Sequence, residues 1–176
     1  MSFQSTVSLQ QGFGVPGELF TDAPYIALPY TIYSASHPEY NIIGATCCTV
    51  TSQGFCQAGA GGTLGFAGFL VDPKDQALFG SGGVPLNPTL TVNNYDIVEC
   101  LTMGTIIVTL PAAANIGDYV VFDNTTGAIS TISPTTPLAS GTTFANAQVT
   151  YYTQGVSGSA LAVITVNPTY IIPQPL

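Results

Sequence analysis

Short apolar blocks, separated by frequent prolines and glycines, set the strongest limit on what this chain can fold into. Its 176 residues include 13 Pro and 19 Gly, and the apolar blocks do not recur at the spacing of an amphipathic helix. Apolar side chains alternate instead: Ile106, Val108 and Leu110 share one face of an extended strand, while Ile107 and Thr109 share the other. This pattern predicts an all-β protein whose strands are covered on both faces.

Turn signals divide the second half of the chain into short strands at regular intervals. The expected strands are 89–92, 97–101, 105–110, 119–122, 128–132, 148–152 and 161–166, with further blocks at 41–50 and 66–71. Strands at this spacing are typical of a compact β-barrel or a jelly-roll-like β-sandwich. We therefore predict one β-rich domain over residues 39–176, densest in strands at 89–166. The only helical candidate is the short segment 111–114, which is long enough for a single turn at most.

Residues 1–38 have a different character, because they are rich in Gly and Pro and show little strand alternation before Tyr25. We predict an extended N-terminal arm here. Its aromatic side chains need a surface to bury against, which is either a neighbouring subunit or the chain's own domain. The residues expected to contact a partner protein or a neighbouring subunit are Phe3, Phe13, Val15, Pro16, Phe20 and Tyr25.

Formal charge is nearly absent from this sequence. Charged residues make up 6% of it, against about 25% in an ordinary soluble domain. A neutral surface with so many apolar side chains is best explained if a partner covers part of it. Lys74 is the only Lys or Arg and the formal net charge is -8. Nucleic-acid binding requires clustered basic residues and is therefore not expected.

The four cysteines are Cys47, Cys48, Cys56 and Cys100, and their spacing matches neither a zinc site nor a disulfide scaffold. We expect buried free thiols in a reducing compartment. The first residues do not have the basic and apolar regions of a secretory signal, so we expect the protein to fold in the cytosol of the cell that makes it. Every apolar run is shorter than the ~20 residues of a membrane-spanning helix, so no such helix is expected.

No group of residues predicts catalysis, a cofactor or a bound metal. His37 is the only imidazole and lies in a loop without a nucleophile motif. The glycine run at 59–62 is not followed by the Lys and Ser or Thr of a phosphate-binding loop. Asp72, Asp75, Asp118 and Asp123 lack calcium-loop spacing and are expected to hydrogen-bond in turns. We expect neither an enzyme nor a small-molecule substrate.

Several segments, taken in order along the chain, are similar to one protein family. They are Ser2-Phe-Gln-Ser-Thr-Val7, Gly14-Val-Pro-Gly-Glu18, Phe66-Ala-Gly-Phe-Leu-Val-Asp-Pro-Lys74, Ile116-Gly-Asp-Tyr-Val-Val-Phe-Asp-Asn-Thr-Thr-Gly-Ala-Ile129 and Ala160-Leu-Ala-Val-Ile164. Their succession resembles the head decoration or structural cement proteins of tailed bacteriophages. Cysteines at 47, 48 and 56 are not part of this resemblance.

The resemblance implies a non-enzymatic protein that binds the outside of a phage capsid and joins neighbouring major capsid subunits. It also implies self-association as a dimer or trimer on the capsid lattice, without nucleic acid or membrane. Two alternatives remain open at this point. One is another virion β-protein, such as a tail or fibre adaptor, and the other is a carbohydrate-binding β-sandwich that uses Tyr25, Tyr30, Tyr33 and Tyr40 as a stacking platform.

Overall fold

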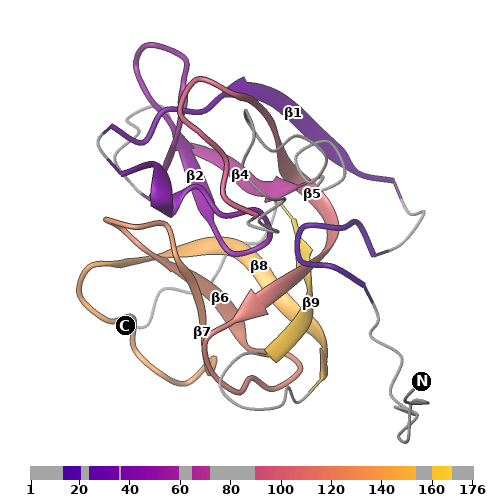
Figure 1. Cartoon of the computed structure of the whole chain (residues 1–176). Helices are drawn as coiled ribbons and strands as arrows, with labels where there is room; N and C mark the ends of the chain where they lie inside the picture. Colours follow the sequence, from indigo (N-terminus) through magenta and orange to yellow (C-terminus); the bar gives the residue numbers. More distant parts are fainter. Residues whose placement is uncertain are drawn as a thin grey trace, which may run out of the picture.

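The computed structural model describes residues 14–20, 24–35, 37–59, 65–71, 90–153 and 160–167 (Figure 1). These residues form nine strands and one short 3-10 helix, η1 (Pro38–Tyr40). The strands are β1 (Ile26–Thr31), β2 (Cys47–Val50), β3 (Cys56–Ala58), β4 (Phe66–Val71), β5 (Ile97–Leu110), β6 (Tyr119–Asp123), β7 (Ile129–Ile132), β8 (Thr142–Thr153) and β9 (Ala160–Val166). The predicted all-β class is confirmed. None of the described segments is a helix long and apolar enough to cross a bilayer.

The strands form one antiparallel sheet that curls into a half-barrel. Their order is β3-β2-β4-β5-β9-β8-β6-β7, and β1 pairs with the first half of β5. The curl brings the two ends of the sheet together, because Thr46 bridges to Ala128 and the Cys47 amide donates to the Gly127 carbonyl oxygen at 2.9 Å. Gly127 has φ +71, and a Cβ there would lie 2.5 Å from the Gly59 nitrogen. This contact between the ends therefore requires glycine.

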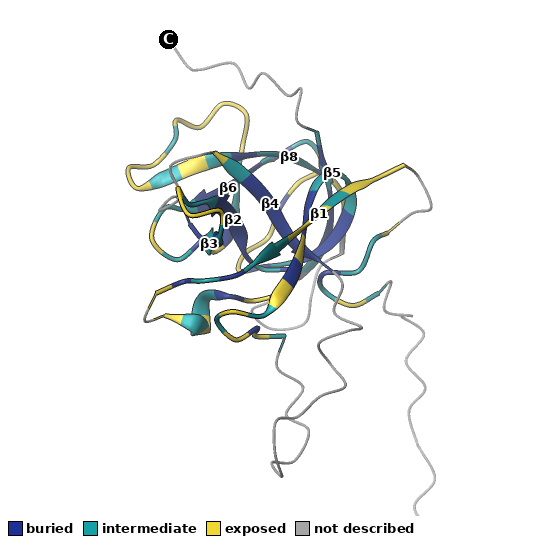
Figure 2. Ribbon diagram, turned by 90° about the horizontal axis from the view of Figure 1, so that it is seen from above, coloured by how far each residue is buried: buried dark blue, intermediate teal, exposed yellow. Residues whose placement is uncertain are grey.

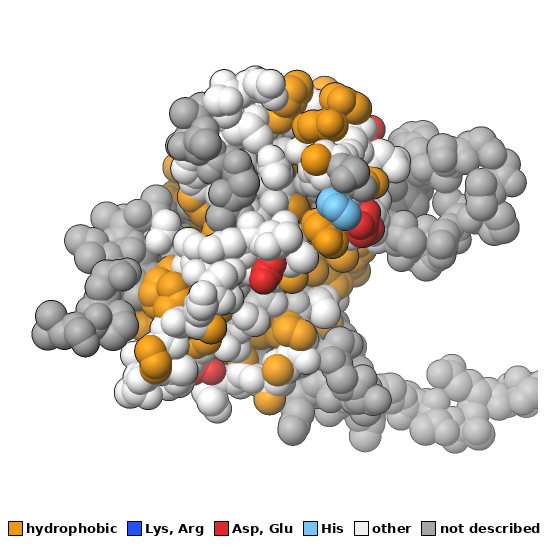
Figure 3. Space-filling view, turned by 90° about the vertical axis from the view of Figure 1, so that its left-hand side faces the viewer, with side chains coloured by type: hydrophobic (Ala, Val, Ile, Leu, Met, Phe, Trp, Pro, Cys, Tyr) orange, Lys and Arg blue, Asp and Glu red, His pale blue; other side chains and the backbone are white. Residues whose placement is uncertain are grey.

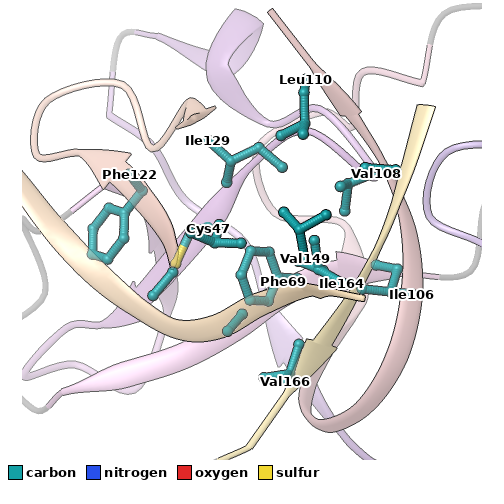
Figure 4. Packing of buried hydrophobic residues seen from close by; sticks show 14 of the residues in the cluster. Cys47, Phe69, Ile106, Val108, Leu110, Phe122, Ile129, Val149, Ile164 and Val166 are labelled. Carbon is teal, nitrogen blue, oxygen red and sulfur yellow. The ribbon is translucent and has the colours of Figure 1, made fainter. Parts of the chain in front are cut away.

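The larger core fills the inside of the curled sheet and receives side chains from seven strands, β2 and β4 to β9. Ile106, Val108 and Leu110 of β5 point inward, as their alternation predicted. They pack with Phe69 of β4 and Ile164 of β9, as Figure 4 shows. Each fully buried side chain of this size contributes about 1.5–3 kcal/mol, so this core is the main source of stability.

A second core lies on the opposite face of β2, β3, β4 and the first half of β5. Its buried members are Ile32, Ile43, Cys48, Cys56, Ala67, Leu70, Val92, Val98 and Cys100. The two cores explain why both adjacent cysteines are buried, because the Cys47 side chain faces the first core and the Cys48 side chain faces the second. All four cysteines are free and buried, which confirms that part of the sequence prediction.

The turn implied between the expected strands at 97–101 and 105–110 is wrong, because β5 runs unbroken from Ile97 to Leu110. The first half of β5 pairs with β1 and β4, and the second half pairs with β9. Gly104 lies where the partners change and has φ +134, and a Cβ there would lie 2.8 Å from the Cβ of Tyr25. The glycine that indicated a turn therefore marks a close approach between two strands.

Other expected elements also differ from the structure. β8 begins at Thr142 instead of residue 148, β2 covers only part of the block at 41–50, and Thr91 forms an isolated bridge to Ile42 instead of a strand. Residues 111–112 form a bend, and residues 111–114 contain no helical turn. β3 was not expected in the glycine-rich segment. Strand limits depend on which neighbours are available for pairing, and that is not visible in local sequence.

The described part of the predicted arm lies against the chain's own sheet. The Gly17 amide donates to the Ile107 carbonyl oxygen at 2.7 Å, the Ile107 amide donates to Glu18 at 2.9 Å, and the Phe20 amide donates to Thr105 at 3.1 Å. β1 then continues along β5. Residues 1–13 lie outside the described residues, and the domain boundary at residue 38 stays a prediction.

Candidate functional site

Six exposed apolar side chains lie around one edge of β5, and we call this surface the β5-edge patch. It consists of Val15, Phe20, Tyr25, Ile26, Leu28 and Tyr151, which are 41–53% exposed. Backbone pairing sets their order, since Phe20 bonds to Thr105, Ile26 pairs with Met103, and Leu28 pairs with Cys100. Figure 2 shows exposed residues along β1, the central part of this surface.

Tyr151 joins the patch from β8, far along the chain. Its ring stacks on the ring of Phe20, with centroids 6.5 Å apart and an interplanar angle of 16°. β5 and β9 separate the two backbones within the sheet, so the rings meet across these strands. Val163, the partner of Tyr151 on β9, is buried although it does not belong to the inner core. This stacked pair therefore extends the patch onto the outer face of the sheet.

The structure brings together three of the side chains proposed from sequence for partner contact, Val15, Phe20 and Tyr25. Pro16 is half-buried against Gly44, where an added Cβ would lie 2.7 Å from the Pro16 Cβ. Phe3 and Phe13 lie outside the described residues. A role in contact stays a prediction for all six.

Sequence reasoning missed Ile26, Leu28 and Tyr151. The alternation of Ile26 and Leu28 indicates a strand, but Pro29 directly after them argues against one. Tyr151 joins the patch only through the pairing of β8 with β9 and of β9 with β5.

A second group of aromatic side chains lies at the other end of β1, and we call it the aromatic cluster. Tyr33 follows β1, Phe55 precedes β3, and Tyr95 precedes β5. The Tyr33 and Tyr95 rings stack with centroids 5.0 Å apart, and the Phe55 ring lies 6.1 Å from Tyr33 and 6.4 Å from Tyr95. A hydrogen bond with Tyr33 raises the pKa of Tyr95, which is 64% exposed.

Buried polar groups hold the aromatic cluster in place. The Ser34 hydroxyl donates to Asn41 Oδ1, and Asn41 Nδ2 donates to Asn94 Oδ1 and to the Val92 carbonyl oxygen, both at 3.2 Å. The Ser34 amide donates to Asn94 Oδ1 at 2.9 Å. Ser34 and Asn94 are the chain neighbours of Tyr33 and Tyr95, so this network fixes both aromatic positions. Tyr95 keeps φ +74, a conformation that is rare for a bulky residue.

The four tyrosines proposed as one stacking platform are not brought together. Tyr25 and Tyr33 lie at opposite ends of β1, and Tyr40 stacks on His37 with centroids 5.0 Å apart. Tyr30 is partly buried against the second core. That platform is wrong, because a run of nearby tyrosines in sequence is spread along a strand and the loop that follows it.

His37 interacts with its own loop. Its Nδ1 lies 2.8 Å from Glu39 Oε1, and both side chains are exposed. The hydrogen bond with His37 lowers the pKa of the Glu39 carboxyl. The described residues contain no Lys or Arg, since Lys74 lies outside them. Figure 3 shows a face on which the single His and a few acidic side chains lie among uncharged ones.

Three thiols lie together in the second core. Hydrogen bonds with Cys100 and Cys56, and then burial, raise the pKa of Cys48 well above its ordinary value. Hydrogen bonds with Cys100 and Cys48 lower the pKa of Cys56 to about 5, but its side chain is fully buried and out of reach of a dissolved electrophile. Among the described residues, no three His, Cys, Asp or Glu side chains are placed to hold a metal ion.

This geometry defines a class of protein, a β-protein that exposes apolar side chains on its surface and whose described thiols and imidazole are either buried or paired within a loop. Its sequence matches the model of the structural cement protein family (E217 gp24/Pam3 gp6) over residues 3–167. The chain therefore belongs to the structural cement proteins of phages, as its sequence resemblance implied, and has a structural role in the virion.

One similar solved structure agrees with this fold. A chain of "The capsid of Myoviridae Phage XM1" is 18% identical, with a TM-score of 0.56, over 96% of this chain and 99% of that chain. At this identity the similarity shows the fold alone. No curated protein sequence matches the chain.

Proposed function

We propose that this protein decorates the outer surface of a tailed-phage capsid and cements it by bridging neighbouring major capsid subunits. The proposed role is non-enzymatic, and the copies associate with one another as dimers or trimers on the lattice. Membership of the structural cement family supports the proposal, as does the fold shared with a chain of a phage capsid structure. The observation that carries it is the β5-edge patch, an exposed apolar surface built from three separate parts of the chain.

The composition of the patch favours a protein partner. Large apolar side chains that gather on one surface of a soluble protein usually mark an interaction site. Phe20, Tyr25 and Tyr151 are of the aromatic type that carries most binding energy in protein interfaces. The segment holding Phe20 is hydrogen-bonded to β5, so little ordering is required when the patch binds. Residues 1–13 precede it and are proposed to extend the same contact.

Many copies on one lattice make a modest contact sufficient. Each copy that touches two subunits holds them together, and repetition over a symmetric shell multiplies the effect. Few charges take part, so the contact is expected to be insensitive to salt. We expect the affinity for shells to change less than about threefold between about 0.1 and 0.5 M NaCl, because there is little charge to screen.

Binding to shells that lack this protein tests the proposal. Tyr25→Ala removes an exposed ring at the patch and keeps the Cβ that faces Gly104. We expect this variant to bind shells about tenfold or more weakly in a sedimentation assay, as for a central aromatic residue of an interface. The matched control is Tyr95→Gly, which removes an exposed tyrosine ring at the other end of β1 and suits φ +74.

The proposal predicts that the control variant binds shells like wild type. It is rejected if wild-type protein does not bind shells, or if Tyr25→Ala binds as tightly as wild type. A reconstruction of the particle separates the alternatives, because a tail or fibre adaptor would be found at the tail and not on the shell.

A further inference from the structure

We propose that the aromatic cluster of Tyr33, Phe55 and Tyr95 is a binding site for a neutral saccharide. This activity is additional to the cement role and uses a different surface. Aromatic rings present a negative face, which attracts the C–H groups on the apolar face of a sugar ring. Tyr95 is 64% exposed, and its ring stacks on Tyr33 and meets Phe55 edge-on, so an exposed ring is held in place for a sugar to stack on.

Polar groups next to the rings match the hydroxyls of a sugar. Asn93 is exposed, and its backbone amide donates to Asp96 Oδ2 at 3.3 Å, which holds the two residues beside Tyr95. The side-chain amide of Asn93 can donate and accept hydrogen bonds, and the carboxylate of Asp96 can accept them. A small number of polar groups around an apolar platform is the usual composition of a small-ligand site.

The platform is held in advance of binding. Asn41 is fully buried and links Ser34 to Asn94, the residues adjacent to Tyr33 and Tyr95. Tyr95 remains at φ +74 although a tyrosine disfavours this conformation. Backbone strain of this kind persists only where the surroundings impose it, and it is concentrated at ligand-binding positions. A preformed site binds a weakly interacting ligand without a further loss of chain entropy.

Charge and size select a neutral sugar over other ligands. The described residues contain no Lys or Arg to bind phosphates, sulfates or sialic acids, and Asp96 would repel them. A protein partner needs about 800 Å² on each side of a stable interface. One aromatic side chain offers roughly 150–250 Å², and Tyr33 and Phe55 are half-buried, so the cluster falls short of that area. One or two sugar rings fit it.

The location of the cluster leaves it open while the protein is bound to a shell. Leu28 is the last patch residue on β1, and Tyr33 follows it five residues later, which spans up to roughly 17 Å of extended chain. A molecule attached through the patch would present the cluster at a distance from the contact.

Screening of the full chain against an array of neutral and acidic oligosaccharides tests the proposal, followed by calorimetry with the best neutral ligand. We expect saturable binding of at least one neutral oligosaccharide, weakened at least tenfold in Tyr95→Gly and little changed in Tyr95→Phe, which keeps the ring. Tyr25→Ala, the matched control, should bind the sugar like wild type. Far-UV circular dichroism and urea unfolding establish that each variant is folded.

Binding of no neutral sugar, binding of acidic sugars only, or equal binding by Tyr95→Gly and wild type would overturn the proposal. If Tyr95→Gly does not fold, Phe55→Ala replaces it with the same expectations. Shell binding is measured on the same preparations. Because Tyr95→Gly should lose sugar binding alone and Tyr25→Ala shell binding alone, failure of one proposal is distinguishable from failure of the other.

Discussion

Replacing Asn41 with Ala would reveal how far one buried side chain stabilises the loops that carry the aromatic cluster. The substitution removes three side-chain hydrogen bonds, to Ser34, Val92 and Asn94. Asn94 Oδ1 still accepts from the Ser34 amide, and the Ser34 oxygen still accepts from the Ala58 amide at 3.1 Å. The Val92 carbonyl oxygen and the Ser34 hydroxyl hydrogen lose the partner that Asn41 provided.

These two buried groups set the size of the effect. A buried polar group that loses its partner costs about 1–3 kcal/mol. We therefore expect Asn41→Ala to lower the free energy of unfolding by about 3 kcal/mol. For a domain of this size, about 2–4 °C of Tm is lost for each kcal/mol, so Tm should fall by about 6–12 °C.

Urea unfolding, followed by far-UV circular dichroism and by tyrosine fluorescence, measures this loss. The fluorescence signal is useful because the chain has 9 Tyr and no Trp. Asn93→Ala is the matched control, since this neighbouring asparagine is exposed and should change stability by less than about 0.5 kcal/mol. A loss below about 1 kcal/mol for Asn41→Ala, or a loss equal to that of the control, would refute the structural role of the network.

Two further predictions concern titration and thiol access. The amides of Thr126 and Thr125 and the Thr126 hydroxyl donate to Asp123 Oδ1 and lower its pKa. A lowered pKa contributes stability above the unfolded value of about 3.9, and this contribution is lost as pH falls through the folded pKa. Asp123→Asn should therefore be less stable than wild type at pH 7, and this difference should disappear in acid. A difference in urea midpoint between the two proteins that is the same at pH 7 and in acid contradicts this prediction. For the cysteines, an aromatic disulfide reagent should label none of the four thiols in the native protein and all four in urea, because all are buried. Rapid labelling of any thiol without denaturant would show that the second core opens.

Several parts of this fold could be predicted from residues that are close in sequence. The inward face of the second half of β5 follows from alternation, and β4 was found at its observed limits. Cys47 and Cys48 were correctly expected to be buried and free. In each case the information is local, because adjacent side chains of a strand point to opposite faces.

Long-range pairing explains the failures. Gly104 indicated a turn because glycine is frequent in turns, but β5 continues through this residue. The part of β5 before Gly104 pairs with β4 and β1, and the part from Gly104 onward pairs with β9. Pro29 suggested an irregular arm, yet β1 tolerates it as a strand that, among the strands the structure describes, pairs with β5 alone. The expected platform of four tyrosines was also wrong because of long-range contacts. The Tyr33 ring packs against Phe55 and Tyr95, which lie in loops far from it in the sequence.

Composition and local alternation were thus enough to predict a nearly uncharged β-protein with buried thiols, and to predict that a partner covers part of its apolar surface. Folding in three dimensions decided which side chains form that surface. Phe20 meets Tyr151, and Tyr33 meets Tyr95, only after β5 has paired with β1 on one side and β9 on the other. Such contacts depend on the closure of long loops between distant strands, and no pattern of neighbouring residues records which strands will pair.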